Sequence, residues 1–333
     1  MKTSDKRPTC LMSPPPYCWH PGGGGTGNDN AARASLRGGT NPKEAGLEWL
    51  AAANDISRTW RIIVMPPGKR PQRSFDKVFA ADIGRYFKGT GFLVSNMRAP
   101  DRMGESAYVK WFFSKKLRMK MIGQARSFWE GSSCVRTSPK RTFAVVGYGV
   151  RADRGSCDEI SRLLKFPPDR ILRIQLKKPH IHLDTGLARL SSCDPLIVVC
   201  RAAFADADET WDPDETFTRL YELTREEGSA FENVCQSDGV NYATNLREEP
   251  NGQVYVPNGL TAFYAKVLGK YGYKVHPLNM PRLFEDGGGA AACLTLPLQE
   301  AVEDGWEPPE QYLYENVRAK IQGQVELYPT HQV

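Results

Sequence analysis

The sequence predicts an α/β protein built from repeated units, and three observations support this. Short apolar runs bounded by Gly, Pro or Asn alternate with helical stretches over most of the 333 residues. The main apolar runs recur at intervals of roughly 40 to 60 residues, which is typical of a repeated supersecondary unit. No GxGxxG turn follows a strand-like run, so a plain doubly wound nucleotide-binding sheet is the weaker alternative.

The elements follow from the spacing of apolar residues. Apolar residues at helical spacing, or polar stretches between strand-like runs, predict helices over 44–56, 156–164, 214–227 and 260–268. Runs of β-branched and aromatic residues predict strands, and these are at 60–65, 91–94, 142–146, 171–176, 195–199, 253–256, 273–277 and 293–296. Two of the helices lead directly into a further strand, which is the order expected of strand–helix–strand units.

Three regions divide the chain. Pro14-Pro15-Pro16 and the run Gly22 to Gly25 cannot hold a regular element, so we expect residues 1–42 to form a loosely ordered N-terminal segment with a Pro/Gly-rich insertion. Residues 43–300 should form a catalytic α/β domain, to which an opening strand near 10–17 contributes. Residues 301–333 are interpreted as a C-terminal extension.

Composition excludes several classes of protein. Forty-four Lys and Arg against 38 Asp and Glu give a net charge of +6, which is too mild and too scattered for a nucleic-acid binder but suits a substrate with a carboxylate. No run of about 18 apolar residues is present, so no membrane span is expected. The polar start is not a secretory signal, and eight cysteines without a CxxC pair favour a reduced, cytoplasmic compartment.

The segment His180-Ile181-His182-Leu183-Asp184 is the first candidate for chemistry. On an extended strand, residues two apart face the same side, so His180, His182 and Asp184 would line one face. Such a face could bind a metal through nitrogen and oxygen ligands. Alternatively, His182 could transfer protons beside a carboxylate that grips a cationic substrate, with His180 a structural histidine.

Cys293 is the second candidate, because glycine and alanine residues precede it from Gly287 to Ala292. Small residues let a substrate approach the sulfur closely, and a thiolate activated by a histidine or a cation is a strong nucleophile. The alternative is a small buried thiol without a chemical role.

Three carboxylates among apolar and aromatic residues form the third candidate set: Asp76, Asp82 and Glu130. Buried acids are costly unless they are paired, and a planar guanidinium substrate would pair with them through bidentate hydrogen bonds. The alternative for Asp76 and Asp82 is that they cap turns.

Taken in order, these motifs resemble the guanidino-group-modifying, or pentein, superfamily, which includes arginine deiminase, dimethylarginine dimethylaminohydrolase and the amidinotransferases. The resemblance covers roughly residues 11–298, and Ser132-Ser133 stand where the family has Gly-Asp. The similar segments are 11–17, 76–82, 100–105, 130–131, 147–151, 182–185 and 287–295.

The resemblance implies a five-bladed, pseudo-fivefold α/β propeller of ββαβ units with the active site in its central channel. It also implies roles for the matching residues. Cys293 would be the nucleophile, His182 the general acid and base, and Glu130 its acidic partner. Substrate-binding residues would be Asp82 and Asp184 at the guanidinium, with Arg102 and Arg151 at a carboxylate.

The implied reaction attacks the guanidino carbon of an arginine-like small molecule through a covalent thiouronium intermediate, and it needs no metal and no other cofactor. Water as the second nucleophile gives a hydrolase, which we favour. An amine gives an amidinotransferase. Residues 79–83 closely resemble the amidinotransferase version of the segment that carries Asp82. An inactive pentein and a metallohydrolase using His180, His182 and Asp184 are the further alternatives. A homodimer is possible.

Overall fold

The computed structural model describes residues 7–16, 41–66, 75–100, 102–234, 242–257 and 262–330. In this part of the chain, the strands form five separate three-stranded sheets. The sheets are β15(Leu296–Pro297)-β1(Thr9–Met12)-β2(Arg61–Val64), β3(Gly84–Phe87)-β4(Gly91–Val94)-β5(Met121–Gln124), β6(Val135–Thr137)-β7(Ala144–Tyr148)-β8(Ile171–Gln175), β9(Leu187–Leu190)-β10(Leu196–Val199)-β11(Ala230–Asn233) and β12(Arg247–Glu248)-β13(Gln253–Pro257)-β14(Lys274–Leu278).

Every sheet has the same construction. Its first strand pairs antiparallel with the second, and the second pairs parallel with the third. A parallel pair needs a crossover connection, which a helix supplies in each sheet. These helices are α2(Pro42–Ile56), α3(Glu105–Trp111), α4(Arg154–Leu164), α5(Pro213–Glu226) and α7(Ala262–Lys270).

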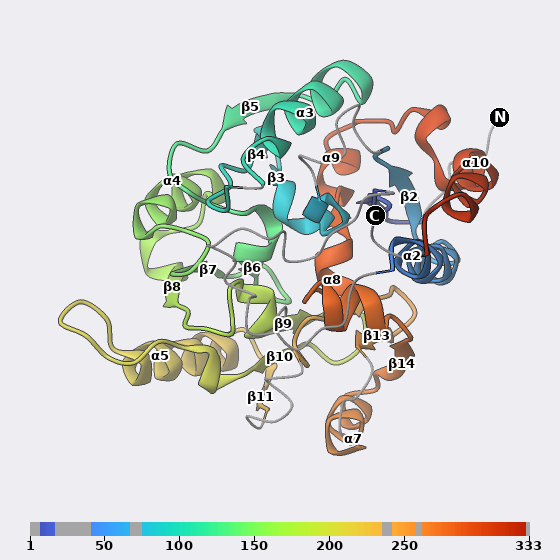
Figure 1. The fold of residues 1–333 in the computed structure, drawn as a ribbon. Coiled ribbons are helices and arrows are strands. Elements are labelled where there is room, and N and C mark those ends of the chain that lie inside the picture. Colours follow the sequence, from blue (N-terminus) through green and yellow to red (C-terminus); the bar gives the residue numbers. More distant parts are fainter. Residues whose placement is uncertain are drawn as a thin grey trace.

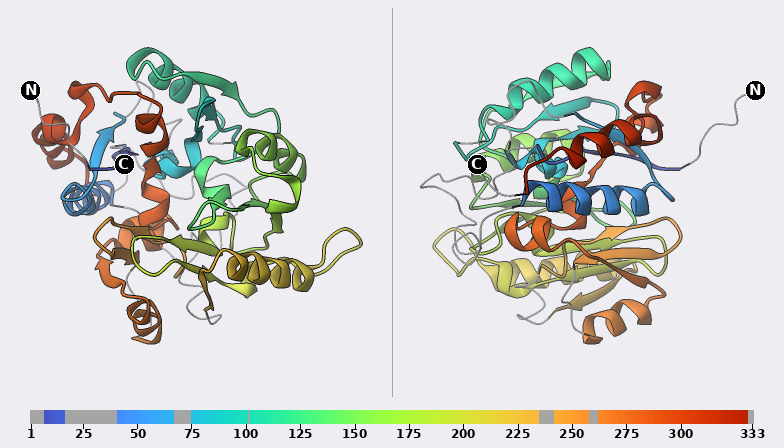
Figure 2. Two further views of the ribbon diagram at one scale, coloured as in Figure 1. Left: turned by 180° about the vertical axis from the view of Figure 1, so that it is seen from behind. Right: turned by 45° about the vertical axis from the view of Figure 1, so that its right-hand side comes forward.

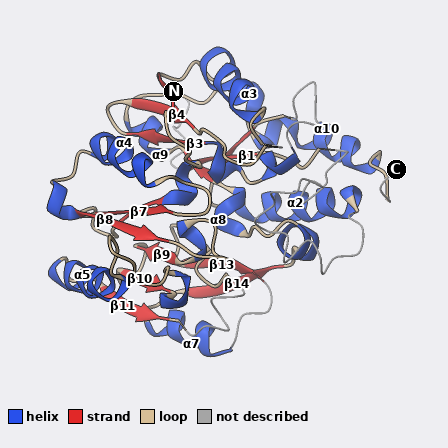
Figure 3. Cartoon of the chain, turned by 60° about the vertical axis from the view of Figure 1, so that its left-hand side comes forward, coloured by secondary structure: helices blue, strands red, loops and turns tan. Residues whose placement is uncertain are grey.

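The five ββαβ units stand around a common centre (Figure 1). The first strands β3, β6 and β9 lie nearest the middle, and the crossover helices lie on the outside (Figures 1 and 3). This is the five-bladed α/β propeller that the resemblance implies. Because the first strands lie nearest the middle, the turns that enter these strands lie around the centre of the ring.

Local sequence sets where the helices begin. Pro42 occupies the first turn of α2, and the side chain of Asn41 accepts a hydrogen bond from the backbone nitrogen of Glu44. Asp212 caps α5 in the same way and is also followed by proline. Both helices therefore begin within two residues of the positions that the apolar spacing predicts.

The two ends of the described chain meet in one blade. Strand β15 pairs antiparallel with β1, so residues near the C-terminus complete the first sheet. Helix α10(Tyr314–Glu326) packs on α2, where Val325 lies against Gly46. Figure 2 shows α10 and α2 side by side. The predicted C-terminal extension therefore packs on the first blade.

The sequence predicts the second and third strands of most blades and four of the five crossover helices. It misses the short first strands β3, β6, β9 and β12. The prediction of a strand over 293–296 is wrong in part, because Cys293 lies in the helical turn α8(Ala291–Leu294) and only Leu296–Pro297 pair as a strand. The Gly-rich insertion, residues 17–40, lies outside the described residues.

None of the helices described is long and apolar enough to cross a membrane. The six cysteines in the described part of the chain are free thiols.

Candidate active site

The candidate residues lie on the turns that lead into the first strands. Four of these turns are η3(Ala80–Ile83), η5(Gly131–Cys134), η7(Leu183–Thr185) and α8, and the fifth spans 242–245. Because the first strands surround the centre of the ring, these turns bring together residues more than 200 positions apart in sequence, such as Asp82 and Cys293. The candidate side chains on them are all buried, namely those of Asp82, Glu130, His182, Asp184 and Cys293.

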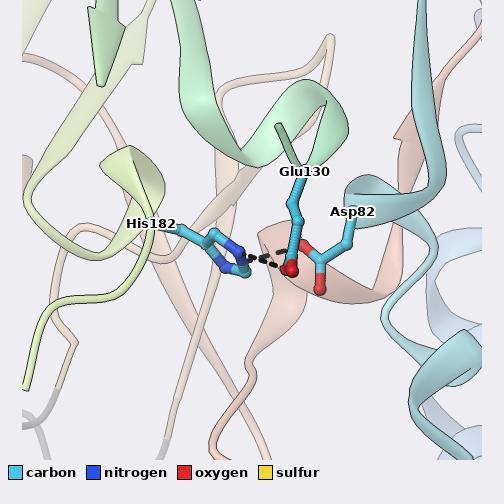
Figure 4. Close-up of side chains that lie close together, drawn as sticks. All are labelled: Asp82, Glu130 and His182. Carbon is cyan, nitrogen blue, oxygen red and sulfur yellow. Dashed lines mark hydrogen bonds and ion pairs between the residues drawn. The ribbon is translucent and has the colours of Figure 1, made fainter. Parts of the chain in front are cut away.

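Glu130, His182 and Asp82 form the centre of the site (Figure 4). His182 Nε2 lies 2.9 Å from Glu130 Oε2, and His182 Nδ1 lies 3.6 Å from Asp82 Oδ1. Each ring nitrogen of the imidazole therefore faces a carboxylate. An imidazole in this position can hold a proton while it remains buried.

The electrostatics of this cluster favour charged groups. Burial opposes ionisation of Glu130, but Arg151 and the hydrogen bond from His182 hold its pKa well below the usual range. Burial would lower the pKa of His182, but Asp82 and Glu130 outweigh this effect and raise it. The expected state of the free protein is an imidazolium between carboxylates.

Cys293 stands beside Asn245 and Asp184. Asn245 Nδ2 donates a hydrogen bond to Cys293 Sγ over 2.8 Å, and the thiol donates to Asp184 Oδ2 over 3.4 Å. Asn245 Oδ1 accepts from the backbone nitrogens of Ala292 and Cys293 at 3.1 and 3.3 Å. The amide thus fixes the turn and the sulfur together.

The thiol is protonated in this state of the protein. Burial, followed by the negative charges of Asp184 and Asp82, raises the pKa of Cys293 well above its ordinary value. Burial also raises the pKa of Asp184, which Arg136 opposes. A cation placed between these acids would remove the repulsion that keeps the proton on the sulfur.

One carboxylate oxygen of the site has no hydrogen-bond partner among the described residues. This atom is Asp184 Oδ1, which is fully buried, while Oδ2 contacts Cys293 and lies 3.6 Å from Arg136 Nη2. A buried acceptor without a donor costs about 1–3 kcal/mol. The site therefore lacks a donor next to the sulfur, and a ligand with N–H groups would supply it.

Arg102 and Arg151 are both buried and both contact the acids of the site. Arg102 Nη1 lies 2.6 Å from Asp82 Oδ2 and 3.7 Å from Glu130 Oε2, while its other nitrogens bind Glu105. Arg151 Nη1 lies 3.2 Å from Glu130 Oε1. In this structure the two guanidinium groups neutralise Asp82 and Glu130.

His180 does not share a face with His182 and Asp184, so that expectation is wrong. The chain leaves the extended conformation after His182 and enters η7, which turns Asp184 toward Cys293. His180 Nδ1 instead lies 2.9 Å from the backbone oxygen of Thr185, so it is a structural histidine. The backbone of Asp76 belongs to η2(Phe75–Val78), and its side chain lies outside the described part of the chain.

This geometry also bears on the metal alternative. The described residues that could hold a metal ion together are Asp82, Glu130 and His182, not the predicted His180, His182 and Asp184. The guanidinium of Arg102 already contacts both carboxylates of this set, so in this structure a cation of the protein occupies the place where a metal would bind.

Sequence reasoning missed Asn245, Ser133 and Arg136. Ser133 Oγ donates to Asp82 Oδ1, and Ser132 Oγ donates to the backbone oxygen of Gly84, so the serines hold the turn in place. Asn245 stands two residues before a first strand, as Asp82 does. This position could have marked Asn245 as a candidate only if the first strands had been predicted, and the sequence did not reveal them.

Gly131 allows two of these turns to approach each other. Its φ is +54°, and a Cβ at this position would meet the backbone oxygens of Ala81 and Asp82. We expect Gly131→Ala to destabilise the protein by about 3 kcal/mol, through the left-handed conformation and the backbone clash. Denaturant unfolding measures this change.

Gly269→Ala is the matched control, because a Cβ there meets nothing within 4 Å and the residue lies in α7. Alanine in a helix should leave stability unchanged or raise it by up to about 1 kcal/mol. Equal unfolding midpoints for the two variants would contradict the role given to Gly131.

Solved structures with a similar fold include an arginine dihydrolase and a dimethylarginine dimethylaminohydrolase. The N-terminal domain of ArgZ, a cyanobacterial arginine dihydrolase, matches with a TM-score of 0.69 and 22% identity, over 87% of this chain and 97% of that chain. AgrE with bound L-arginine matches with a TM-score of 0.69 and 20% identity, over 87% and 40%. A dimethylarginine dimethylaminohydrolase adduct matches with a TM-score of 0.59 and 16% identity, over 87% and 99%.

These matches show that the chain has the pentein fold. The chain spans the whole N-terminal domain of ArgZ but only 40% of the full-length ArgZ chain. No protein-family model matches the sequence, and no curated protein matches it.

Proposed function

We propose that the protein is a cysteine-dependent hydrolase that acts on the guanidino carbon of arginine or of a related guanidino compound. The observation that carries this proposal is the pairing of Cys293 Sγ with Asp184, whose second oxygen has no donor among the described residues. A guanidinium carries N–H groups along its edge, and a carboxylate accepts two of them in parallel. Binding there would place the guanidino carbon next to the sulfur.

The arrangement of the acids supports the same substrate class. Asp184 Oδ2 accepts from Cys293 Sγ, and Asp82 Oδ1 lies 3.6 Å from His182 Nδ1, so one acid faces the thiol and the other faces the imidazole. A flat cation bound between them would be held in a fixed plane for attack. Neutral substrates would gain nothing from these carboxylates.

The substrate cation also explains how a protonated thiol can become a nucleophile. When the guanidinium offsets the charge of Asp184, the pKa of Cys293 falls, the thiol releases its proton to solvent, and the thiolate forms only with substrate in place. The hydrogen bond from Asn245 stabilises the resulting negative charge. An empty site therefore keeps an unreactive thiol.

The reaction then follows in two halves. The thiolate forms a C–S bond at the guanidino carbon, the C–N bond to the leaving amine breaks, and His182 gives its proton to that amine. His182 next removes a proton from water, the new C–O bond forms, and the C–S bond breaks. Glu130 orients the imidazole and stabilises its charge through the 2.9 Å contact.

Arg102 and Arg151 keep their assignment to a substrate carboxylate within this proposal. Both bind acids of the site in the free protein, so the assignment requires them to exchange part of these contacts when substrate enters. Asp76 retains its place as a candidate substrate-binding residue from the sequence alone.

The product identifies the second nucleophile. We expect the purified protein, incubated with arginine, methylarginines, guanidinoacetate or agmatine, to convert at least one of them to a urea-type product or its hydrolysis products without an added amine. Chromatography of the products measures this. A product that appears only with an amine acceptor would instead establish the amidinotransferase, and no turnover of any guanidino compound would contradict both.

A further inference from the structure

A cavity lies on the axis of the propeller, next to the candidate active site. Its volume is about 260 Å³, and residues from the first strands of all five blades line it. It also touches Ala81, Ser132, Thr244 and Ala292, each of which adjoins a residue of the site in sequence. None of Asp82, Glu130, His182, Asp184 and Cys293 lines it, so the cavity is separate from the catalytic groups.

Arginine recurs on the first strands around this cavity. Arg85, Arg136, Arg189 and Arg247 stand on β3, β6, β9 and β12, and all four line the cavity. The lining residue on β15 is Pro297. Four of the five blades therefore each contribute an arginine of the first strand to the same space.

The cavity carries a strong excess of positive charge. Arg141 adds a fifth arginine, and the acids in the lining are Glu248 and Glu300. Both acids have partners: Glu248 accepts from the backbone nitrogens of Ser191 and Ser192, and Glu300 pairs with Arg141. Burial lowers the pKa of Arg85; Glu300 opposes this shift, and the neighbouring arginines Arg136, Arg189 and Arg141 add to it.

Two arginines that line this cavity have guanidinium nitrogens without a hydrogen-bond acceptor among the described residues. Arg85 Nε, Arg247 Nε and Arg247 Nη2 are buried, and no described residue accepts a hydrogen bond from them. The guanidinium of Arg247 stacks 3.6 Å from the centre of the Trp60 ring, which fixes its plane. Buried donors without acceptors are expensive, so an acceptor is expected.

We propose that this cavity is a binding site for a small polyanion, with phosphate-type or carboxylate-type oxygens, that is distinct from the guanidino site. Arginine forks bind both kinds of oxygen in the same bidentate way. The volume is smaller than that of pockets for drug-sized ligands, so the ligand should have few atoms. A cationic guanidino substrate is repelled by the same charges.

Isothermal titration calorimetry of the full chain with inorganic pyrophosphate and with citrate, at constant ionic strength, tests the proposal. We expect one site per chain for at least one anion, and the tighter anion identifies the type of oxygen that the cavity takes. Arg189→Gln should weaken binding roughly tenfold or more, because it removes a charged hydrogen-bond donor. Arg141→Gln should also weaken binding. The Arg141 side chain is 43% exposed, so this variant should keep the fold.

Arg219→Gln is the matched control, since Arg219 pairs with Glu222 and Glu226 on the surface of α5. Binding of the anion should be unchanged in this variant. No binding of either anion, or equal affinity in wild type, Arg189→Gln and Arg141→Gln, would overturn the proposal. These measurements involve no turnover, so they stand apart from the test of the hydrolase.

Discussion

Replacing Cys293 by serine should reduce turnover of guanidino compounds by roughly 10³-fold or more, since a group that forms the covalent bond is removed. Mass spectrometry of the intact wild-type protein with substrate should show an added amidino-type fragment, and the variant should show none. The fold should survive, because serine is close in size to cysteine and Asn245 can donate to the hydroxyl as it does to the sulfur.

Cys193→Ser is the matched control, because Cys193 is a half-buried free thiol in the turn between β9 and β10. This variant should keep both turnover and the adduct. Full activity in Cys293→Ser would remove the thiol from the mechanism and leave the protein without the proposed chemistry.

Glu130→Gln should lower the free energy of unfolding by about 3–5 kcal/mol, because breaking a buried ion pair leaves an uncompensated charge. Arg151 and His182 would each lose a charged partner. Turnover should fall as well, since the imidazole loses the group that orients it. Denaturant unfolding over a range of pH values measures the stability change.

The pH dependence has a defined window. Glu130 has a depressed pKa in the folded protein, so its contribution is present above the ordinary value of 4.5 and is lost as the pH falls. His182 has a raised pKa, so its contribution is present below the ordinary value of 6.5 and is lost as the pH rises through the raised value. The difference between wild type and Glu130→Gln should therefore be largest between pH 4.5 and 6.5.

Glu226→Gln is the control for this change. Glu226 pairs with Arg170 and Arg219, but its side chain is 45% exposed, so the loss should be about 1 kcal/mol or less. A stability change in Glu130→Gln as small as that of Glu226→Gln would contradict the buried network.

The repeat was visible in the sequence because the second strands are fully buried. Runs such as Leu196–Val199 are apolar at every position, and burial on both faces requires this. The first strands are short and carry arginines, as in Val135–Thr137, because they face a polar centre. Apolar periodicity cannot find such strands.

The candidate site was predicted residue by residue where the family resemblance supplied a motif. His182, Asp184 and Cys293 were also singled out by their local patterns, and the structure places Asp184, which lies in the turn that follows His182, next to Cys293. Asn245 and Arg136 belong to no motif that the sequence reveals. Their importance depends on contacts with residues 48 positions apart in sequence, as for Asn245 with Cys293, and such contacts exist only in the folded chain.

The pairing of β15 with β1 has a consequence for how activity arises during biosynthesis. Leu296 pairs with Leu11, only three residues after the thiol, so the sulfur reaches its place only when the ring closes. A nascent chain that ends before β15 already contains His180 and His182, and also the acids Asp82, Glu130 and Asp184. We expect such a truncated chain to be chemically silent, because ring closure is the last step that delivers the nucleophile.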